Sequence, residues 1–195
     1  MAGPPNATRL VLASASPRRR ALLRLAGLEP EVRPTPVNEA VGPDESPATY
    51  VARVARTKAH AVRRDLGEVV IAADTTVVLD GAPLGKPDSD AHALRLLRAL
   101  AGRSHEVVTG VAVLDGAGRL SELTVETRVV MTELDDEEIE AYVATGEPFG
   151  KAGGYAIQGR AAGFVERIEG SWTSVVGLPL AETRVLLRDA GVPVP

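Results

Sequence analysis

The sequence predicts an α/β fold rather than a helical bundle or a β-sandwich. Runs with the composition of strands alternate with runs of helical periodicity along the chain, as in proteins built from strand and helix units. Two early candidate strands are apolar at every position, which is typical of strands that are buried in a sheet. The chain shows neither an internal repeat nor a low-complexity linker.

The first strand and the first helix form a candidate anion site. Leu10 to Ala13 is an apolar strand, Ser16 suits the N-cap of a helix, and Pro17 suits its first position. Unpaired backbone N–H groups at a helix start attract an anion, and Arg18 and Arg19 add charge and forked donors. We expect a phosphate-bearing ligand here. The simpler alternative is a capped surface helix whose arginines are solvated.

A long helix follows a short strand and an acidic loop. Glu31 to Arg33 is the candidate strand, and a proline-rich loop over residues 34–47 carries Glu39. In the helix that Ser46 and Pro47 open, an apolar stripe at three- and four-residue steps includes Lys58 at its edge. Lys58 is therefore either a group that reaches a site or a solvated helix lysine.

Asp74 directly follows a buried strand over Val69 to Ala73. In open α/β sheets ligands bind at the carboxyl ends of strands, so we expect Asp74 at such an edge. After an extended segment and the turn at Asp80 and Gly81, the returning chain brings Lys86 back toward this carboxylate. The alternative is that Asp74 only ends the strand and accepts backbone hydrogen bonds.

The second half of the chain continues the alternation. Four acids at 135–138 begin a helix, where they complement the helix dipole rather than form a metal site. A glycine-rich stretch spans residues 146–163. The remaining elements are a helix from Asp88 to about Leu100, strands at 107–114, 120–131, 164–168 and 173–176, and a closing helix from Pro179 to about Ala190.

Composition excludes several classes of protein. The 195 residues, 45% of them hydrophobic, can bury about 70% of the unfolded surface in one or two lobes. The absence of cysteine excludes disulfides and thiolate chemistry. No segment has the pattern of a membrane span or a signal peptide, so we expect a cytoplasmic protein with no membrane partner. A net charge of -4 with 3% aromatic residues argues against nucleic acid as a partner.

Two familiar phosphate motifs do not fit the segment around Asp74. Gly81 to Lys86 differs from a P-loop, because three residues instead of four separate its glycines and Pro87 replaces the magnesium-binding hydroxyl. Thr76 stands where an aspartyl phosphatase needs a second acid. One carboxylate beside several cations instead suits an attack by water on a phosphoanhydride, directly or with a divalent ion.

Six segments of the chain resemble the Maf family. They are ASASPRR at 13–19, ARTKA at 55–59, AADTTVVLDGAPLGKP at 72–87, SHEVVTGV at 104–111, EPFGKAGGYAIQG at 147–159 and GSWTSVVGLPLAET at 170–183. The match runs in order over roughly residues 9 to 187, which makes it far more specific than one short motif.

The resemblance implies a single Maf-like domain over residues 1–195. Its fold would be an elongated mixed sheet with flanking helices, similar to inosine triphosphate pyrophosphatases, in two lobes with the nucleotide between them. The implied activity is hydrolysis of the α–β bond of a nucleoside triphosphate to a nucleoside monophosphate and pyrophosphate. Mg²⁺, with Mn²⁺ as an alternative, is the implied cofactor, and a homodimer is the implied assembly.

The family's functional residues fall on named positions of this chain. Asp74 takes the place of the general base and Glu39 that of the acidic loop residue, and these two carboxylates would hold the metal. Asn38, where many members have an acid, weakens that metal assignment for the loop. The phosphate-binding positions are Ser14, Arg18, Arg19, Lys58 and Lys86, and the positions linked to substrate choice are Thr75 and Gln158.

The segment GYAIQG resembles the branch of the family that acts on dTTP and UTP. An amide such as that of Gln158 offers one acceptor and two donors, which matches the carbonyl and imide edge of a pyrimidine. Ala156 departs from the family's common glycine. Two alternatives stay open at this point: a 7-methyl-GTP pyrophosphatase, and a regulator of cell division that binds a nucleotide without cleaving it.

Overall fold

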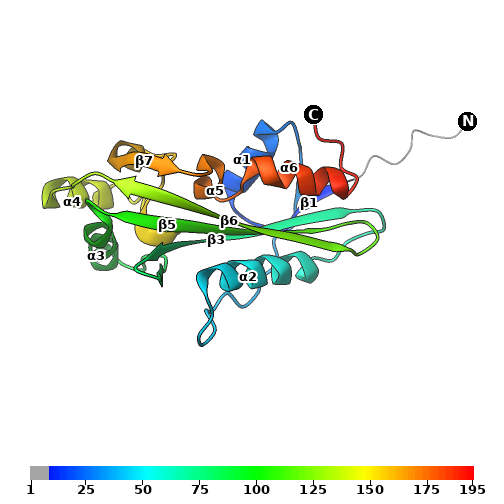
Figure 1. Ribbon diagram of the computed structural model, residues 1–195, viewed down its shortest axis with the longest axis horizontal. Coiled ribbons are helices and arrows are strands. Elements are labelled where there is room, and N and C mark those ends of the chain that lie inside the picture. Colours follow the sequence, from blue (N-terminus) through cyan, green and yellow to red (C-terminus); the bar gives the residue numbers. More distant parts are fainter. Residues whose placement is uncertain (1–8) are drawn as a thin grey trace, which may run out of the picture.

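A computed structural model describes residues 9–195, which form a seven-stranded mixed sheet with helices on both faces (Figure 1). The strands are β1 (Leu10–Leu12), β2 (Glu31–Val32), β3 (Val69–Leu79), β4 (Ala82–Leu84), β5 (Ser104–Leu114), β6 (Leu120–Met131) and β7 (Val165–Glu169). The helices are α1 (Pro17–Leu25), α2 (Pro47–Ala61), α3 (Asp90–Leu100), α4 (Asp136–Ala144), α5 (Trp172–Val176) and α6 (Leu180–Asp189), with short 3₁₀ helices η1 (Ala152–Gly154) and η2 (Arg160–Phe164).

The sheet combines a short parallel part with a long antiparallel part. Its strand order is β2-β1-β3-β5-β6-β7, and β4 pairs with β3. The strands β2, β1 and β3 run parallel, whereas β3, β5, β6 and β7 are antiparallel to their neighbours. The long strands β3, β5 and β6 give the molecule its elongated shape in Figure 1. The predicted elongated mixed sheet with flanking helices is therefore confirmed.

Helices cover the two faces of the sheet unequally. In Figure 1, α2 lies below the sheet, whereas α1, α5 and α6 lie above it. Alternate residues of β3 serve the two sides: Val70 and Ala72 pack with the apolar stripe of α2, and Ile71 and Ala73 belong to the larger core on the other face. Within residues 9–195, none of the helices combines the length and apolar character needed to traverse a bilayer.

Gly110 allows α2 to lie unusually close to the sheet. A Cβ atom on this residue of β5 would stand 2.7 Å from the backbone carbonyl of Val51 in α2. Glycine is the only residue that leaves this space free. The close packing holds the buried stripe of α2, including Lys58, directly over β3.

Asp74 lies in the middle of a continuous strand, so its predicted place at the end of a strand is wrong. Residues 69–79 form one strand because β5 pairs with β3 along nearly its full length, from Val70 to Val78. One edge of β3 is nevertheless unpaired near Asp74, because β1 stops beside Ile71 and β4 joins β3 only from Val77 onward. Asp74 lies between these two neighbours, where the carboxyl end of β1 opens one side of the sheet.

The predicted strand at 173–176 is also wrong, because these residues belong to the short helix α5. The β-branched residues of the segment favour a strand, but its two ends favour a helix. Ser171 caps the start by accepting a hydrogen bond from the backbone N–H of Ser174, and Gly177 ends the helix with a φ of 123°. Local capping therefore outweighs the strand propensity of these few residues.

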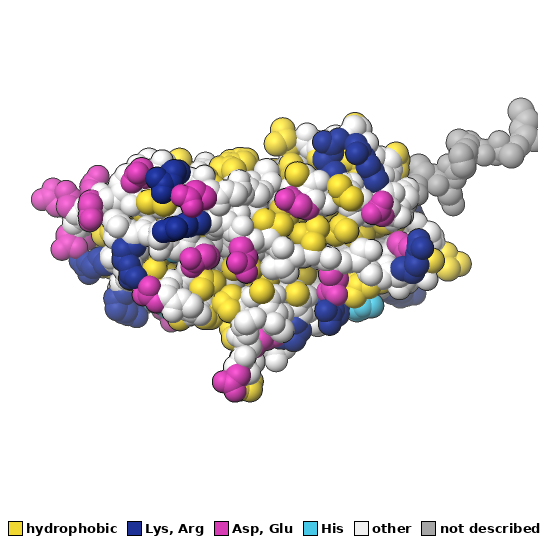
Figure 2. Space-filling model, in the orientation of Figure 1, with side chains coloured by type: hydrophobic (Ala, Val, Ile, Leu, Met, Phe, Trp, Pro, Cys, Tyr) yellow, Lys and Arg dark blue, Asp and Glu magenta, His cyan; other side chains and the backbone are white. Residues whose placement is uncertain are grey.

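The acidic cluster at the start of α4 is a helix cap. Asp135 accepts a hydrogen bond from the backbone N–H of Glu138, whose side chain accepts one from the backbone N–H of Asp135. Figure 2 shows acidic side chains gathered at this end of the molecule. The cluster matches the expectation that these acids complement the helix dipole.

Candidate functional site

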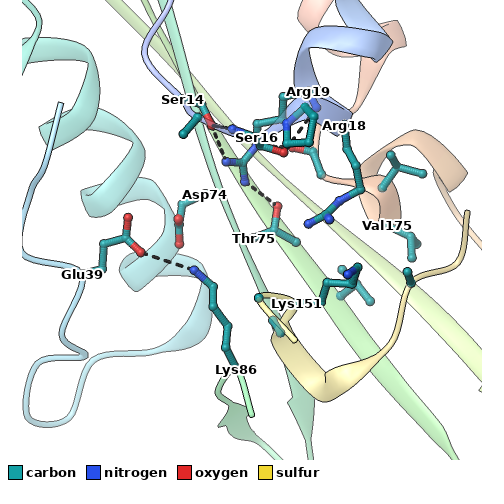
Figure 3. Close-up of a pocket in the computed structure, with 18 of the residues that line it drawn as sticks. Ser14, Ser16, Arg18, Arg19, Glu39, Asp74, Thr75, Lys86, Lys151 and Val175 are labelled. Atoms are coloured by element: carbon teal, nitrogen blue, oxygen red, sulfur yellow. Dashed lines mark hydrogen bonds and ion pairs between the residues drawn. The ribbon is translucent and has the colours of Figure 1, made fainter. Parts of the chain in front are cut away.

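A cavity of about 610 Å³ opens where β1 ends (Figure 3). The nine residues selected from the sequence all line it. Its walls come from the start of α1, the middle of β3, the loop before α2, the segment after β4, the glycine-rich loop and the end of α5. The selected residues are Ser14, Arg18, Arg19, Glu39, Lys58, Asp74, Thr75, Lys86 and Gln158. The fold thus brings together side chains that are as much as 144 positions apart, since Ser14 and Gln158 share the cavity.

Two carboxylates share one ammonium group on the α2 side of the cavity. The Lys58 Nζ lies 2.8 Å from Asp74 Oδ1 and 2.7 Å from Glu39 Oε1. Lys58 and Asp74 are almost fully buried, whereas Glu39 comes from the exposed loop before α2. The Lys86 Nζ lies 3.8 Å from the second oxygen of Glu39, and Figure 3 shows both side chains at the same end of the cavity.

Positive charge governs the ionisation of Glu39. Burial by itself would raise the pKa of this carboxyl group, but the hydrogen bond from Lys58 and the charges of Lys58 and Lys86 hold the pKa below its ordinary value. Glu39 is therefore ionised at neutral pH. The carboxylates of Glu39 and Asp74 each have a further oxygen, and carboxylate oxygens are hard ligands of the type that Mg²⁺ takes together with substrate phosphates.

Arg19 makes three hydrogen bonds, all to neutral acceptors. Its guanidinium donates to Ser14 Oγ at 3.0 Å, to Thr75 Oγ1 at 3.2 Å and to the backbone carbonyl of Gly177 at 2.9 Å. Burial lowers the pKa of Arg19 somewhat, while the nearby charge of Asp74 acts in the opposite direction. Because arginine stays protonated under all these influences, Arg19 brings a fixed cation into the cavity.

Arg18 is placed to meet an anion from the cavity. Within the described part of the chain it makes no ion pair and no side-chain hydrogen bond. Burial lowers its pKa, as expected for a guanidinium that is partly withdrawn from water without a counter-ion. A cation in this situation is stabilised by a bound phosphate group, because the phosphate supplies the missing charge.

The glycine-rich loop closes the opposite wall of the cavity and carries Gln158. Its start is fastened by Glu147, which accepts hydrogen bonds from the hydroxyl of Tyr142 and the backbone N–H of Arg160. The same loop is joined to the segment after β4 by a hydrogen bond of 3.1 Å from the backbone N–H of Gly153 to the carbonyl oxygen of Gly85. Gln158 is exposed, so its amide is available to a ligand.

Sequence reasoning missed two side chains of this region. Lys151 lines the cavity, and its ammonium donates to the carbonyl oxygens of Glu147 and Phe149 at 2.6 and 3.2 Å. Burial and the charge of Arg18 lower its pKa. Thr109 lies behind Thr75 and bonds to it. Both residues fall inside motifs that resemble the Maf family, which was the only signal available.

Metal ligands are sparse in the described residues. No group of three or more His, Asp or Glu side chains in residues 9–195 is arranged to hold an ion. Asp74 and Glu39 are the two acidic side chains that line the cavity. A divalent ion bound here would therefore depend on oxygens of the substrate as well.

The chain matches a known protein family along nearly its whole described length. The family model described as Maf-like protein matches residues 9–190. A dTTP/UTP pyrophosphatase of Anaeromyxobacter dehalogenans is 56% identical over 192 residues, covering 97% of each chain. One of Chromobacterium violaceum is 48% identical over 196 residues, covering 97% of this chain and 98% of the relative.

A solved structure, the Staphylococcus aureus Ham1 protein, has a TM-score of 0.45 and 16% identity, with 64% of this chain and 72% of that chain covered. A likeness this distant says nothing about activity. The family match, by contrast, spans nearly the whole described chain and includes every wall of the cavity. The chain therefore belongs to the Maf family.

Proposed function

We propose that this protein is a nucleoside triphosphate pyrophosphatase that acts on dTTP and UTP. The observation that carries the proposal is one cavity lined by the carboxylate of Asp74, two lysines and two arginines, and within residues 9–195 neither arginine forms an ion pair with an acid. The relatives that carry the name dTTP/UTP pyrophosphatase are about half identical to this chain over nearly its full length, which supports the same substrate class here.

The reaction joins water to the α-phosphorus and breaks the bond from that phosphorus to the oxygen that bridges to the β-phosphate. Asp74 orients the water and accepts its proton. Arg18, Arg19 and Lys86 bind the phosphate oxygens and balance the charge that grows on the departing pyrophosphate. Lys58 keeps Asp74 in place through its 2.8 Å hydrogen bond. Catalysis depends on position and charge, and no covalent enzyme intermediate is needed.

Mg²⁺, or Mn²⁺ in its place, fits the donor set of the cavity. The carboxylates of Asp74 and Glu39 are hard oxygen ligands, and each keeps an oxygen beyond the one that contacts Lys58. A divalent ion held there supplies further positive charge next to the triphosphate. Asn38 does not line the cavity, so Glu39 is the loop residue that we assign to the ion.

Selection of the pyrimidine rests on the glycine-rich loop and on Thr75. The exposed amide of Gln158 offers one acceptor and two donors to the carbonyl and imide groups of thymine or uracil. We also propose a homodimer, which light scattering of the purified protein will test.

Pyrophosphate release from a panel of nucleoside triphosphates, with and without Mg²⁺, tests the function. The panel includes dTTP, UTP, CTP, GTP and 7-methyl-GTP. We expect turnover of dTTP and UTP, and a loss of about 10²-fold or more in Asp74→Asn. Asp80→Asn is the matched control, since Asp80 lies on the same hairpin at an exposed turn and does not line the cavity. Binding of nucleotides without turnover across the panel supports a regulator instead.

A further inference from the structure

A chain of hydrogen bonds behind the cavity links Thr75, Thr109 and Ser174. The hydroxyl oxygens of Thr75 on β3 and Thr109 on β5 lie 2.9 Å apart, and Thr109 Oγ1 lies 2.9 Å from the backbone carbonyl oxygen of Ser174 in α5. Thr109 and Ser174 are fully buried. Thr75 is partly exposed and lines the cavity.

The direction of every bond in this chain is fixed. A carbonyl oxygen only accepts, so the single hydroxyl hydrogen of Thr109 points to Ser174. The contact between the two threonines therefore uses the hydrogen of Thr75. The guanidinium of Arg19 donates to the same Thr75 oxygen at 3.2 Å, which occupies one of its two lone pairs. Thr75 is left with one free lone pair and no free hydrogen.

On the neighbouring wall, the hydroxyl of Ser14 has the opposite hydrogen-bonding capacity to that of Thr75. Its oxygen accepts from Arg19 Nη1 at 3.0 Å and from the backbone N–H of Ser16 at 3.2 Å. Both lone pairs are then in use, so its hydroxyl hydrogen is free to bind a ligand oxygen. Figure 3 shows that Ser14 and Thr75 contact the same guanidinium from two sides. The cavity thus offers a donor at Ser14 and an acceptor at Thr75.

We infer that Thr109 is a positioning residue for substrate selection: by taking the hydrogen of Thr75, it makes Thr75 an acceptor that binds an N–H or O–H donor of the nucleoside. A phosphate oxygen has no hydrogen to offer and is not bound by such a group, whereas it suits Ser14. The matching donors on dTTP and UTP are the imide N–H of the base and the ribose hydroxyls. This inference rests on the proposed function and names how its site discriminates.

The test uses two substrate pairs and four variants at three threonines. UTP against CTP replaces the imide N–H with an acceptor nitrogen and the neighbouring carbonyl with an amino group, and dTTP against its 3′-deoxy analogue removes the 3′-hydroxyl of the sugar. In Thr109→Val the hydrogen of Thr75 has no buried acceptor and turns toward the ligand. We expect the kcat/KM ratio of one of the two pairs to fall about tenfold. Thr109→Ser keeps the hydroxyl and restores that ratio.

Thr127→Val is the matched control. Thr127 is a buried threonine on β6 whose hydroxyl bonds to the backbone of Ser171, just before α5, so its loss also weakens the packing of α5. We expect this variant to lower the melting temperature without moving either ratio. Thr75→Val removes the acceptor outright and should reduce the same ratio as Thr109→Val, which keeps the test valid if Thr109→Val does not fold.

The inference is overturned if both ratios in a folded Thr109→Val stay within about twofold of wild type, or if Thr127→Val moves them equally. Dissociation constants for the same nucleotides, measured by calorimetry, give the ratios without turnover. A wild-type protein that binds these nucleotides selectively but releases no pyrophosphate therefore refutes the proposed function, while the role of Thr109 is still decided by the binding ratios.

Discussion

Replacing Lys58 with methionine tests whether its ammonium keeps Glu39 ionised beside Asp74. The Lys58 Nζ lies 2.7 Å from Glu39 Oε1 and 2.8 Å from Asp74 Oδ1. The two carboxylate oxygens can therefore be no more than about 5.5 Å apart, and at a separation of about 5 Å two unit charges repel by about 3 kcal/mol at an effective dielectric constant of about 20. Methionine has a similar length but no charge, so nothing in its side chain balances this repulsion. Since 1.36 kcal/mol corresponds to one pH unit, the acidic limb of the pH–rate profile should move upward by about two pH units.

Two measurements check this shift. Pyrophosphate release from UTP between pH 5 and 9 at constant Mg²⁺ gives the acidic limb, and a ¹³C carboxyl NMR titration of the free protein gives proton uptake without turnover. Lys86→Met is the matched control, because Lys86 is 59% exposed and lies 3.8 Å from Glu39. We expect its limb to move by less than about half a pH unit. An unmoved limb in Lys58→Met, or equal shifts in both variants, would show that the Lys58 ammonium does not control the ionisation of Glu39.

Three further predictions concern stability. Glu68 is fully buried and accepts bonds of 2.9 and 3.0 Å from Arg33, which lower its pKa to about 2. Glu68→Gln should therefore lower the free energy of unfolding, measured with urea, by about 2 kcal/mol at pH 7. This difference from wild type should shrink as the pH falls from about 4.5 toward 2, because the wild-type carboxylate loses its charge there. Burial lowers the pKa of His105 to about 4, so the unfolded chain binds a proton between about pH 6.5 and 4 that the folded protein does not. As the pH falls over that range, the free energy of unfolding of the wild type should decrease by up to about 3 kcal/mol more than that of His105→Asn. Parallel pH dependences of the two free energies would contradict this. Gly110→Ala should cost about 2 kcal/mol, because the new Cβ meets the backbone of α2 at 2.7 Å, whereas Gly163→Ala, with open space around it, should be nearly neutral in the same thermal melts.

Local patterns in the chain predicted the type of most elements. The strand, turn and helix at residues 10–25 follow from an apolar run, the cap Ser16 and Pro17, all of which act within a few residues. The stripe that carries Lys58 follows from helical periodicity. Glu39, Thr75 and Gln158 came from the resemblance to a family, and the structure places all three on one cavity.

The errors arose where distant partners or competing local signals decide the structure. Asp74 lies within a strand because β5, more than thirty residues later, pairs with β3 past this position. Residues 173–176 form a helix because capping at Ser171 and Gly177 outweighs β-branched side chains. Neither the length of a strand nor the balance between a cap and a propensity is determined by composition alone.

The sequence by itself determined the α/β class, the capped and basic start of α1 and the types of groups that line the cavity, because these depend on short-range periodicity, capping and charge. Only the tertiary structure decided that Lys58 bridges Asp74 and Glu39, and that Thr109 directs the hydroxyl of Thr75. The physical reason is that an ion pair or a hydrogen bond requires two groups within about 3 Å and in the right orientation. Residues on different strands and helices meet these conditions only after the chain has folded.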